Sequence, residues 1–139
     1  MDTSALAKLF VEEAGSAAIS ELMGRGVVVS SAAIAYVELR ASIAAALRMG
    51  RLRAEERDVV LDRLERLWGN VIDIPLDRPL LRLAGDLAEQ AHLRGYDAVH
   101  LAALQTTGDR EEVTFACWDA DLRRAAQALG YALFPPTES

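Results

Sequence analysis

Apolar residues recur at two different spacings along this chain. A spacing of three to four residues, which places apolar side chains on one face of a helix, predicts helices over 4–12, 16–23, 31–48, 54–68, 77–91, 97–106 and 119–129. Short β-branched or apolar runs predict strands over 27–29, 71–74, 113–117 and 131–134. Ser30 and Ser31 are the expected caps of the long third helix, and Asp77 and Pro79 open the fifth.

This alternation of strands and helices predicts the α/β fold class, with a parallel sheet flanked by helices on both faces. A length of 139 residues fits one domain spanning 1–139, which can form a core without disulfides. In such sheets, ligands bind at the carboxyl ends of the strands. We therefore expect functional residues directly after the predicted strands.

The composition excludes several classes of protein. A single cysteine, Cys117, rules out both a disulfide framework and a cysteine-rich zinc site, and favours a cytoplasmic protein. No apolar run reaches the roughly 18 residues that cross a bilayer, and Asp2 stands where a signal peptide has basic residues. The net charge of −6 argues against a broad positive surface that coats nucleic acid. It is compatible with an enzyme that gathers carboxylates around a metal ion.

Three aspartates stand at predicted helix starts. Asp2 precedes the first helix, Asp97 begins an almost wholly apolar helix, and Asp119 follows the third predicted strand and begins the last helix. Each has two interpretations, because Asp is a favoured N-cap and a carboxylate at a strand end is also a candidate metal ligand. Asp121 is either a surface acid or an auxiliary ligand.

The fourth acid, Glu38, lies among apolar residues of the 31–48 helix. Its neighbours on the helical wheel are Ile34, Val37, Ala41 and Ala45, and the opposite stripe is Tyr36, Leu39, Ile43 and Leu47. This pattern predicts a helix buried on two sides. A carboxylate in such a stripe costs several kcal/mol unless it is paired, protonated or bound to a cation. Glu38 is therefore either half of an internal ion pair or a functional residue.

Several carboxylates that converge at strand ends repel one another and cannot all stay ionised without a cation. A hard divalent ion with oxygen ligands, Mg²⁺ or Mn²⁺, relieves this repulsion. The four acids together therefore predict a metal site that acts on a phosphate group.

The four segments that carry these acids resemble, in the same order, the signatures of VapC-type PIN domains. They are residues 2–6 (Asp-Thr-Ser-Ala-Leu), 37–41 (Val-Glu-Leu-Arg-Ala), 94–102 (Arg-Gly-Tyr-Asp-Ala-Val-His-Leu-Ala) and 118–122 (Trp-Asp-Ala-Asp-Leu). The resemblance covers essentially the whole chain, and one such segment alone would carry little information. It implies a PIN-like fold with a parallel sheet of about five strands in the order 3-2-1-4-5.

The resemblance also implies a function. It is that of a metal-dependent endoribonuclease, the toxin of a VapBC-type toxin–antitoxin pair, which hydrolyses RNA to 5′-phosphate and 3′-hydroxyl ends. The implied catalytic residues and ligands of Mg²⁺ or Mn²⁺ are Asp2, Glu38, Asp97 and Asp119. Ser4 would support the site by hydrogen bonding, and Asp121 would assist it. The implied partners are an RNA substrate and a VapB-like antitoxin that can place a basic side chain among the acids.

This sequence departs from the family pattern at two places. The family usually has a hydrophobic strand before its first acid, whereas here only Met1 precedes Asp2. We expect either that the true start lies upstream or that the central strand is shortened, which would weaken the sheet. Cys117 stands where many relatives carry a threonine, and we expect it to orient Asp119 less firmly.

Other interpretations stay open. A non-catalytic PIN-like binding module and a metal phosphoesterase acting on DNA are the alternatives from other classes. His92 and His100 are expected to be structural, since hydrolysis by metal-bound water requires no histidine. The large residues of the 31–48 helix form either a homodimer interface or an internal contact with the 54–68 helix.

Three arginines, Arg48, Arg51 and Arg53, surround the turn at Gly50. Arginine forms bidentate contacts with phosphate, so this turn is a candidate contact for the RNA backbone. A turn whose side chains are simply solvated is the alternative.

Overall fold

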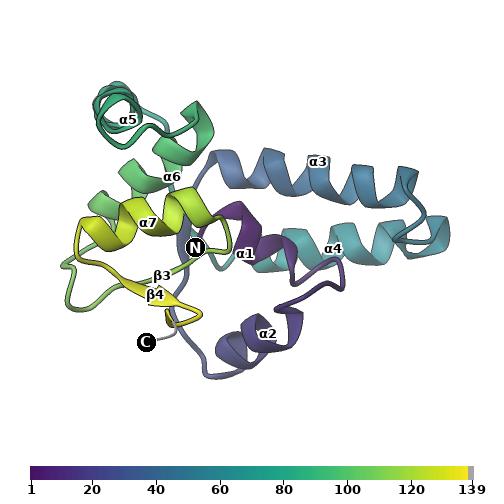
Figure 1. Ribbon diagram of the computed structural model, residues 1–139. Coiled ribbons are helices and arrows are strands. Elements are labelled where there is room, and N and C mark those ends of the chain that lie inside the picture. The colour runs from purple at the N-terminus through teal and green to yellow at the C-terminus, as the bar shows by residue number, and fades with distance from the viewer. Residues whose placement is uncertain (138–139) are drawn as a thin grey trace.

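The computed structural model describes residues 1–137, which form seven α helices, one 3₁₀ helix and four short strands (Figure 1). The helices are α1 (Thr3–Ala7), α2 (Ser16–Gly24), α3 (Ile34–Arg48), α4 (Arg57–Trp68), α5 (Arg78–Ala91), α6 (Gly95–Thr106) and α7 (Ala120–Ala128), with the 3₁₀ helix η1 (Ala54–Glu56) before α4. The strands are β1 (Ser30–Ala32), β2 (Ile72–Ile74), β3 (Thr114–Ala116) and β4 (Ala132–Phe134). The predicted α/β class is confirmed.

The strands form two separate parallel pairs. β1 pairs with β2, with Ser30 opposite Ile72, and β3 pairs with β4, with Thr114 opposite Ala132. Within residues 1–137 the expected single sheet of about five strands is therefore not formed. Two pairs of three-residue strands leave most of the stabilisation of the fold to helix packing.

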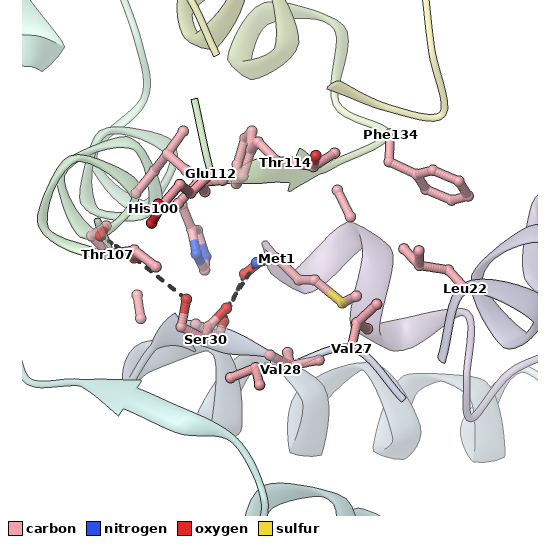
Figure 2. Close-up of a pocket in the computed structure, with 18 of the residues that line it drawn as sticks. Met1, Leu22, Val27, Val28, Ser30, His100, Thr107, Glu112, Thr114 and Phe134 are labelled. Atoms are coloured by element: carbon pink, nitrogen blue, oxygen red, sulfur yellow. Dashed lines mark hydrogen bonds between the residues drawn. The ribbon is translucent and has the colours of Figure 1, made fainter. Parts of the chain in front are cut away.

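The first two residues of the chain contact a strand of each pair. The ammonium group of Met1 donates to the carbonyl of Ser30 at 2.8 Å, and the amide of Asp2 donates to the carbonyl of Ala116 at 3.2 Å. Within residues 1–137 the two pairs share no hydrogen-bonded ladder and stay separate. A cavity of about 550 Å³ lies between them, with Val28 on one side and Thr114 on the other (Figure 2).

The predicted position of the first strand, 27–29, is wrong, because the strand lies three residues later. Val28 is 83% exposed, and the hydrogen-bonded strand is β1. Ser30 and Ser31 are therefore strand residues and not helix caps, and α3 begins after Ala33 without a side-chain cap. Pairing with β2 decided which residues became extended, and propensity alone could not show this.

Two predicted helices have different boundaries in the structure. The first helix ends at Ala7 instead of continuing through residue 12, and the predicted 54–68 helix begins as the 3₁₀ turn η1. The start of α5 is as predicted, since the side chain of Asp77 accepts a hydrogen bond from the amide of Leu80 at 2.9 Å.

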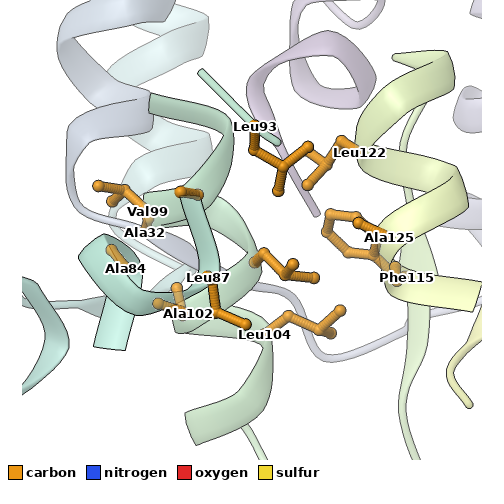
Figure 3. Close-up of a cluster of buried hydrophobic side chains, with 14 of the residues drawn as sticks. Ala32, Ala84, Leu87, Leu93, Val99, Ala102, Leu104, Phe115, Leu122 and Ala125 are labelled. Atoms are coloured by element: carbon orange, nitrogen blue, oxygen red, sulfur yellow. The ribbon is translucent and has the colours of Figure 1, made fainter. Parts of the chain in front are cut away.

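One core lies between α5, α6, α7 and β3 (Figure 3). Its large members include Leu87 of α5, Leu101 of α6, Phe115 of β3 and Leu122 of α7. α6 is buried from Ala98 to Leu104, whereas Tyr96 in its first turn is 65% exposed.

A second core joins α1, α3 and α4. Leu39 and Ile43 of α3 pack there with Leu64 of α4. The large residues of α3 therefore form the internal contact with α4 that was one of the two interpretations of the sequence. The prediction that α3 is buried on two sides is wrong, because Val37 is exposed. No helix within residues 1–137 is both long and apolar enough to cross a membrane.

Candidate active site

Asp2 is a buried carboxylate held by three neighbouring groups. It caps α1, and its Oδ1 accepts a hydrogen bond from the amide of Ala5 at 3.1 Å. The hydroxyl of Ser4 lies 2.8 Å from both carboxylate oxygens, and the thiol of Cys117 lies 3.2 Å from Oδ2. The capping interpretation is confirmed, and it coexists with a fixed orientation of the acid.

Ser4 and Cys117 connect Asp2 to the segment that follows β3. The amide of Trp118 donates to the Ser4 hydroxyl at 2.8 Å. Burial raises the pKa of the Cys117 thiol, and the nearby charge of Asp2 and the hydrogen bond to it raise it further, so the thiol stays protonated and donates. We expected Cys117 to matter for Asp119, but it contacts the carboxylate of Asp2 and only the backbone carbonyl of Asp119, at 3.7 Å.

Glu38 projects from the middle of α3 and is held by two residues that sequence reasoning missed. Its Oε1 accepts a hydrogen bond from the hydroxyl of Thr3 at 2.8 Å and lies 2.7 Å from Nε2 of His100. Because a carboxylate only accepts, this Nε2 carries the proton. The side chain of His100 is 3% exposed and that of Glu38 is 29% exposed.

These contacts set the pKa of Glu38. Burial acts to raise it, but the hydrogen bonds from His100 and Thr3 outweigh burial and hold the pKa below its ordinary value. His100 was expected to be structural, and its burial agrees with that, but its role as partner of Glu38 was not foreseen. The one signal in the sequence was its position three residues after Asp97 on the same helix.

Asp97 and Asp119 share one arginine. Nε of Arg94 donates to Oδ2 of Asp97 at 2.8 Å, and Nη2 of the same guanidinium donates to Oδ2 of Asp119 at 3.2 Å. Asp119 is the N-cap of α7 and accepts from the amide of Leu122, as predicted. The capping interpretation of Asp97 is wrong, because α6 begins one turn earlier and its N-cap position is Arg94.

Asp121 behaves as a surface acid in the structure. Its side chain is exposed and pairs with Arg124 at 2.8 Å. At the turn after α3, Arg51 pairs with Glu13 at 3.3 Å and Arg53 pairs with Glu56 at the same distance. A contact between this turn and RNA stays a prediction.

Arg94 joins the carboxylates of Asp97 and Asp119, whereas Asp2 and Glu38 each have partners of their own. Asp2 touches Cys117, which precedes Asp119 by two residues, and Thr3 joins the start of α1 to Glu38. Within residues 1–137, however, no three His, Cys, Asp or Glu side chains lie close enough together to hold one metal ion. The donor set nonetheless fits a divalent cation, since its carboxylate oxygens suit Mg²⁺ or Mn²⁺. Two of these carboxylates are already bridged by a cationic group, that of Arg94.

The cavity between the two strand pairs is a separate feature. None of the four acids is among its lining residues, whereas His100 of α6 reaches its wall (Figure 2). Nδ1 of His100 is buried without a hydrogen-bond partner among residues 1–137. The cavity is therefore separate from the four acids.

Comparison with known proteins identifies the family of this chain. The family model for the PIN domain matches residues 1–127. The chain belongs to the PIN-domain family. This PIN domain is 37% identical over 134 residues to Ribonuclease VapC45 and equally to Ribonuclease VapC49, both of Mycobacterium tuberculosis. Each match covers 96% of this chain and 92% of the relative. The resemblance to VapC-type PIN domains is confirmed.

Proposed function

We propose that this PIN domain is a metal-dependent endoribonuclease and the toxin of a VapBC-type pair. The observation that carries the proposal is the shared guanidinium of Arg94, which bridges the carboxylates of Asp97 and Asp119. Asp97 lies in the first turn of α6 and Asp119 is the N-cap of α7, and a single cationic group contacts both carboxylates. The names of the two relatives, both ribonucleases, support RNA as the substrate.

In this proposal Asp2, Glu38, Asp97 and Asp119 hold Mg²⁺ or Mn²⁺. When bound, such an ion lowers the pKa of a water molecule and neutralises charge on a phosphate. The residues around the acids keep them oriented. Ser4 and Cys117 fix both oxygens of Asp2, while Thr3 and His100 converge on one oxygen of Glu38 and leave the other free of them.

The proposed partners follow from the same charges. A VapB-like antitoxin could place a basic side chain against the acids, in the manner in which Arg94 already contacts two of them. A cytoplasmic location and a homodimer stay predictions, and the packing of α3 against α4 inside the chain lends no support to the dimer.

The test compares wild type with Asp97→Asn on a labelled RNA, in Mn²⁺ or Mg²⁺ and in excess chelator. We expect RNA cleavage only by wild type and only when metal is present. Asp86→Asn on the exposed face of α5 is the matched control, because it makes the same chemical change away from the acids and should cleave like wild type. Equal cleavage by Asp97→Asn, or cleavage in chelator, would overturn the proposal.

The same assay separates the alternatives. Cleavage of a DNA oligonucleotide without cleavage of RNA would favour the phosphoesterase that acts on DNA. RNA binding without any cleavage would favour a binding module.

A further inference from the structure

The side chain of Arg94 is exposed, yet it bridges two more buried acids. It is 79% exposed, whereas the side chains of Asp97 and Asp119 are 16% and 28% exposed. Some surface arginines pair with a single near neighbour in sequence, such as Arg57 with Asp58 at 2.7 Å. The Arg94 guanidinium thus reaches from solvent onto a carboxylate pair that lies deeper in the protein.

The arginine is the part of this group that can move. Asp119 is held by the amide of Leu122 at the start of α7, and Asp97 lies in the first turn of the buried helix α6. The Arg94 side chain has no hydrogen bonds within residues 1–137 other than those to Asp97 and Asp119, and it makes no side-chain cap bond to α6. Rotation about its side-chain bonds would release both contacts without disturbing the helix.

We propose that Arg94 is an exchangeable counter-ion that holds the Asp97–Asp119 pair in the metal-free protein and, when a divalent ion takes these carboxylates, turns outward to bind a phosphate of the RNA. This inference rests on the function proposed above and adds a substrate-binding residue to it. Arg94 is not a metal ligand, and it competes with the metal for the same oxygens.

Electrostatics gives the reason for the exchange. A carboxylate oxygen that accepts from a guanidinium has fewer lone pairs to offer to a metal ion, and a guanidinium so close to a divalent cation would be repelled. An arginine guanidinium is always charged in proteins, so the group stays charged when it is released. A charged, planar group beside the metal site suits bidentate binding of a phosphodiester.

The first experiment measures metal binding without RNA. Isothermal titration of Mn²⁺ into Arg94→Gln should show an affinity about two- to fivefold higher than that of wild type, because the competitor is gone and exposed ion pairs shift equilibria by such factors. Metal-free Arg94→Gln should melt at a lower temperature than metal-free wild type, while Mn²⁺ should raise its melting temperature by more. Arg57→Gln on α4 removes the same charge from an exposed ion pair and should leave Mn²⁺ affinity unchanged.

The second experiment measures cleavage of a labelled RNA at saturating Mn²⁺. Arg94→Gln should raise KM about tenfold, since it loses a charge-assisted contact with phosphate, and should change kcat less. Arg57→Gln should keep the KM of wild type.

Each result decides one part of the inference. Equal or weaker Mn²⁺ binding by Arg94→Gln, or an equal gain in Arg57→Gln, would overturn the exchange with metal. An unchanged KM would overturn the phosphate contact. If Mn²⁺ binds in the expected order but wild type cleaves no RNA, the proposed ribonuclease function fails while the exchange with metal is supported, because calorimetry does not depend on cleavage.

Discussion

Replacement of Ser4 by alanine is expected to loosen Asp2 and to destabilise the protein. The Ser4 hydroxyl lies 2.8 Å from both carboxylate oxygens of Asp2 and accepts from the amide of Trp118 at 2.8 Å. Its removal takes a donor from a buried carboxylate and leaves a partly buried amide without its partner. Hydrogen bonds to charged groups contribute about 1.5–3 kcal/mol, and an orphaned buried donor costs about 1–3 kcal/mol.

These contributions overlap, so we expect a total loss of about 1.5–3 kcal/mol in the free energy of unfolding. For a chain of 139 residues the unfolding entropy gives a fall of about 3–4 °C in Tm for each kcal/mol, or about 5–10 °C in all. Thermal melts followed by circular dichroism in excess chelator measure this fall without any contribution from metal.

Ser20→Ala is the matched control, because Ser20 is exposed on α2 and the same atom is removed there. Its Tm should stay within about 2 °C of wild type. If Ser4→Ala melted as close to wild type as this control, the hydroxyl would not be holding Asp2, and the argument for a fixed carboxylate would fail.

Three further outcomes are expected. The pKa of Glu38 is lowered from its ordinary value of 4.5, so the ionised form of Glu38 stabilises the metal-free fold. The Tm difference between wild type and Glu38→Gln should therefore shrink as the pH falls from about 6 to about 3. A constant difference would contradict this. Millimolar Mn²⁺ should raise the Tm of wild type and raise that of Asp97→Asn less, because bound metal relieves repulsion among the acids; equal shifts would count against the metal site. In urea unfolding, Gly15→Ala should lower the free energy of unfolding by about 1–3 kcal/mol, since Gly15 has a φ of +95° and a Cβ there would lie 2.7 Å from Nε1 of Trp118. Gly85→Ala, in open space within α5, should raise it by about 0.5–1 kcal/mol. Equal effects would refute the steric argument.

The arrangement also explains why Trp118 is part of the site without touching an acid. Its backbone amide binds Ser4, and its ring lies against Gly15 at the start of α2 and near the ammonium of Lys8, 4.9 Å from the ring centroid. A shift of this ring would pull on the hydroxyl that orients Asp2. The packing of a distant turn therefore contributes to the geometry of the carboxylate.

The order of helices and strands was determined by the sequence, because it depends on contacts between residues close together in the chain. The caps at Asp77 and Asp119 could be read directly, since an aspartate accepts from an amide three residues later. Asp2, Asp97 and Asp119 were found by their positions at predicted helix starts. Glu38 was found by its place in an apolar stripe, and all four segments by their resemblance to one family.

The tertiary structure alone decided which residues pair and which partners the acids take. β1 formed at Ser30–Ala32 because β2 lies beside it, although the valines before it have the higher strand propensity. Glu38 and His100 are 62 residues apart in the chain, and Arg94 and Asp119 are 25 apart. No local pattern records such contacts, because they depend on how α3, α6 and α7 pack together, and a hydrogen bond between distant residues is fixed only once that packing exists.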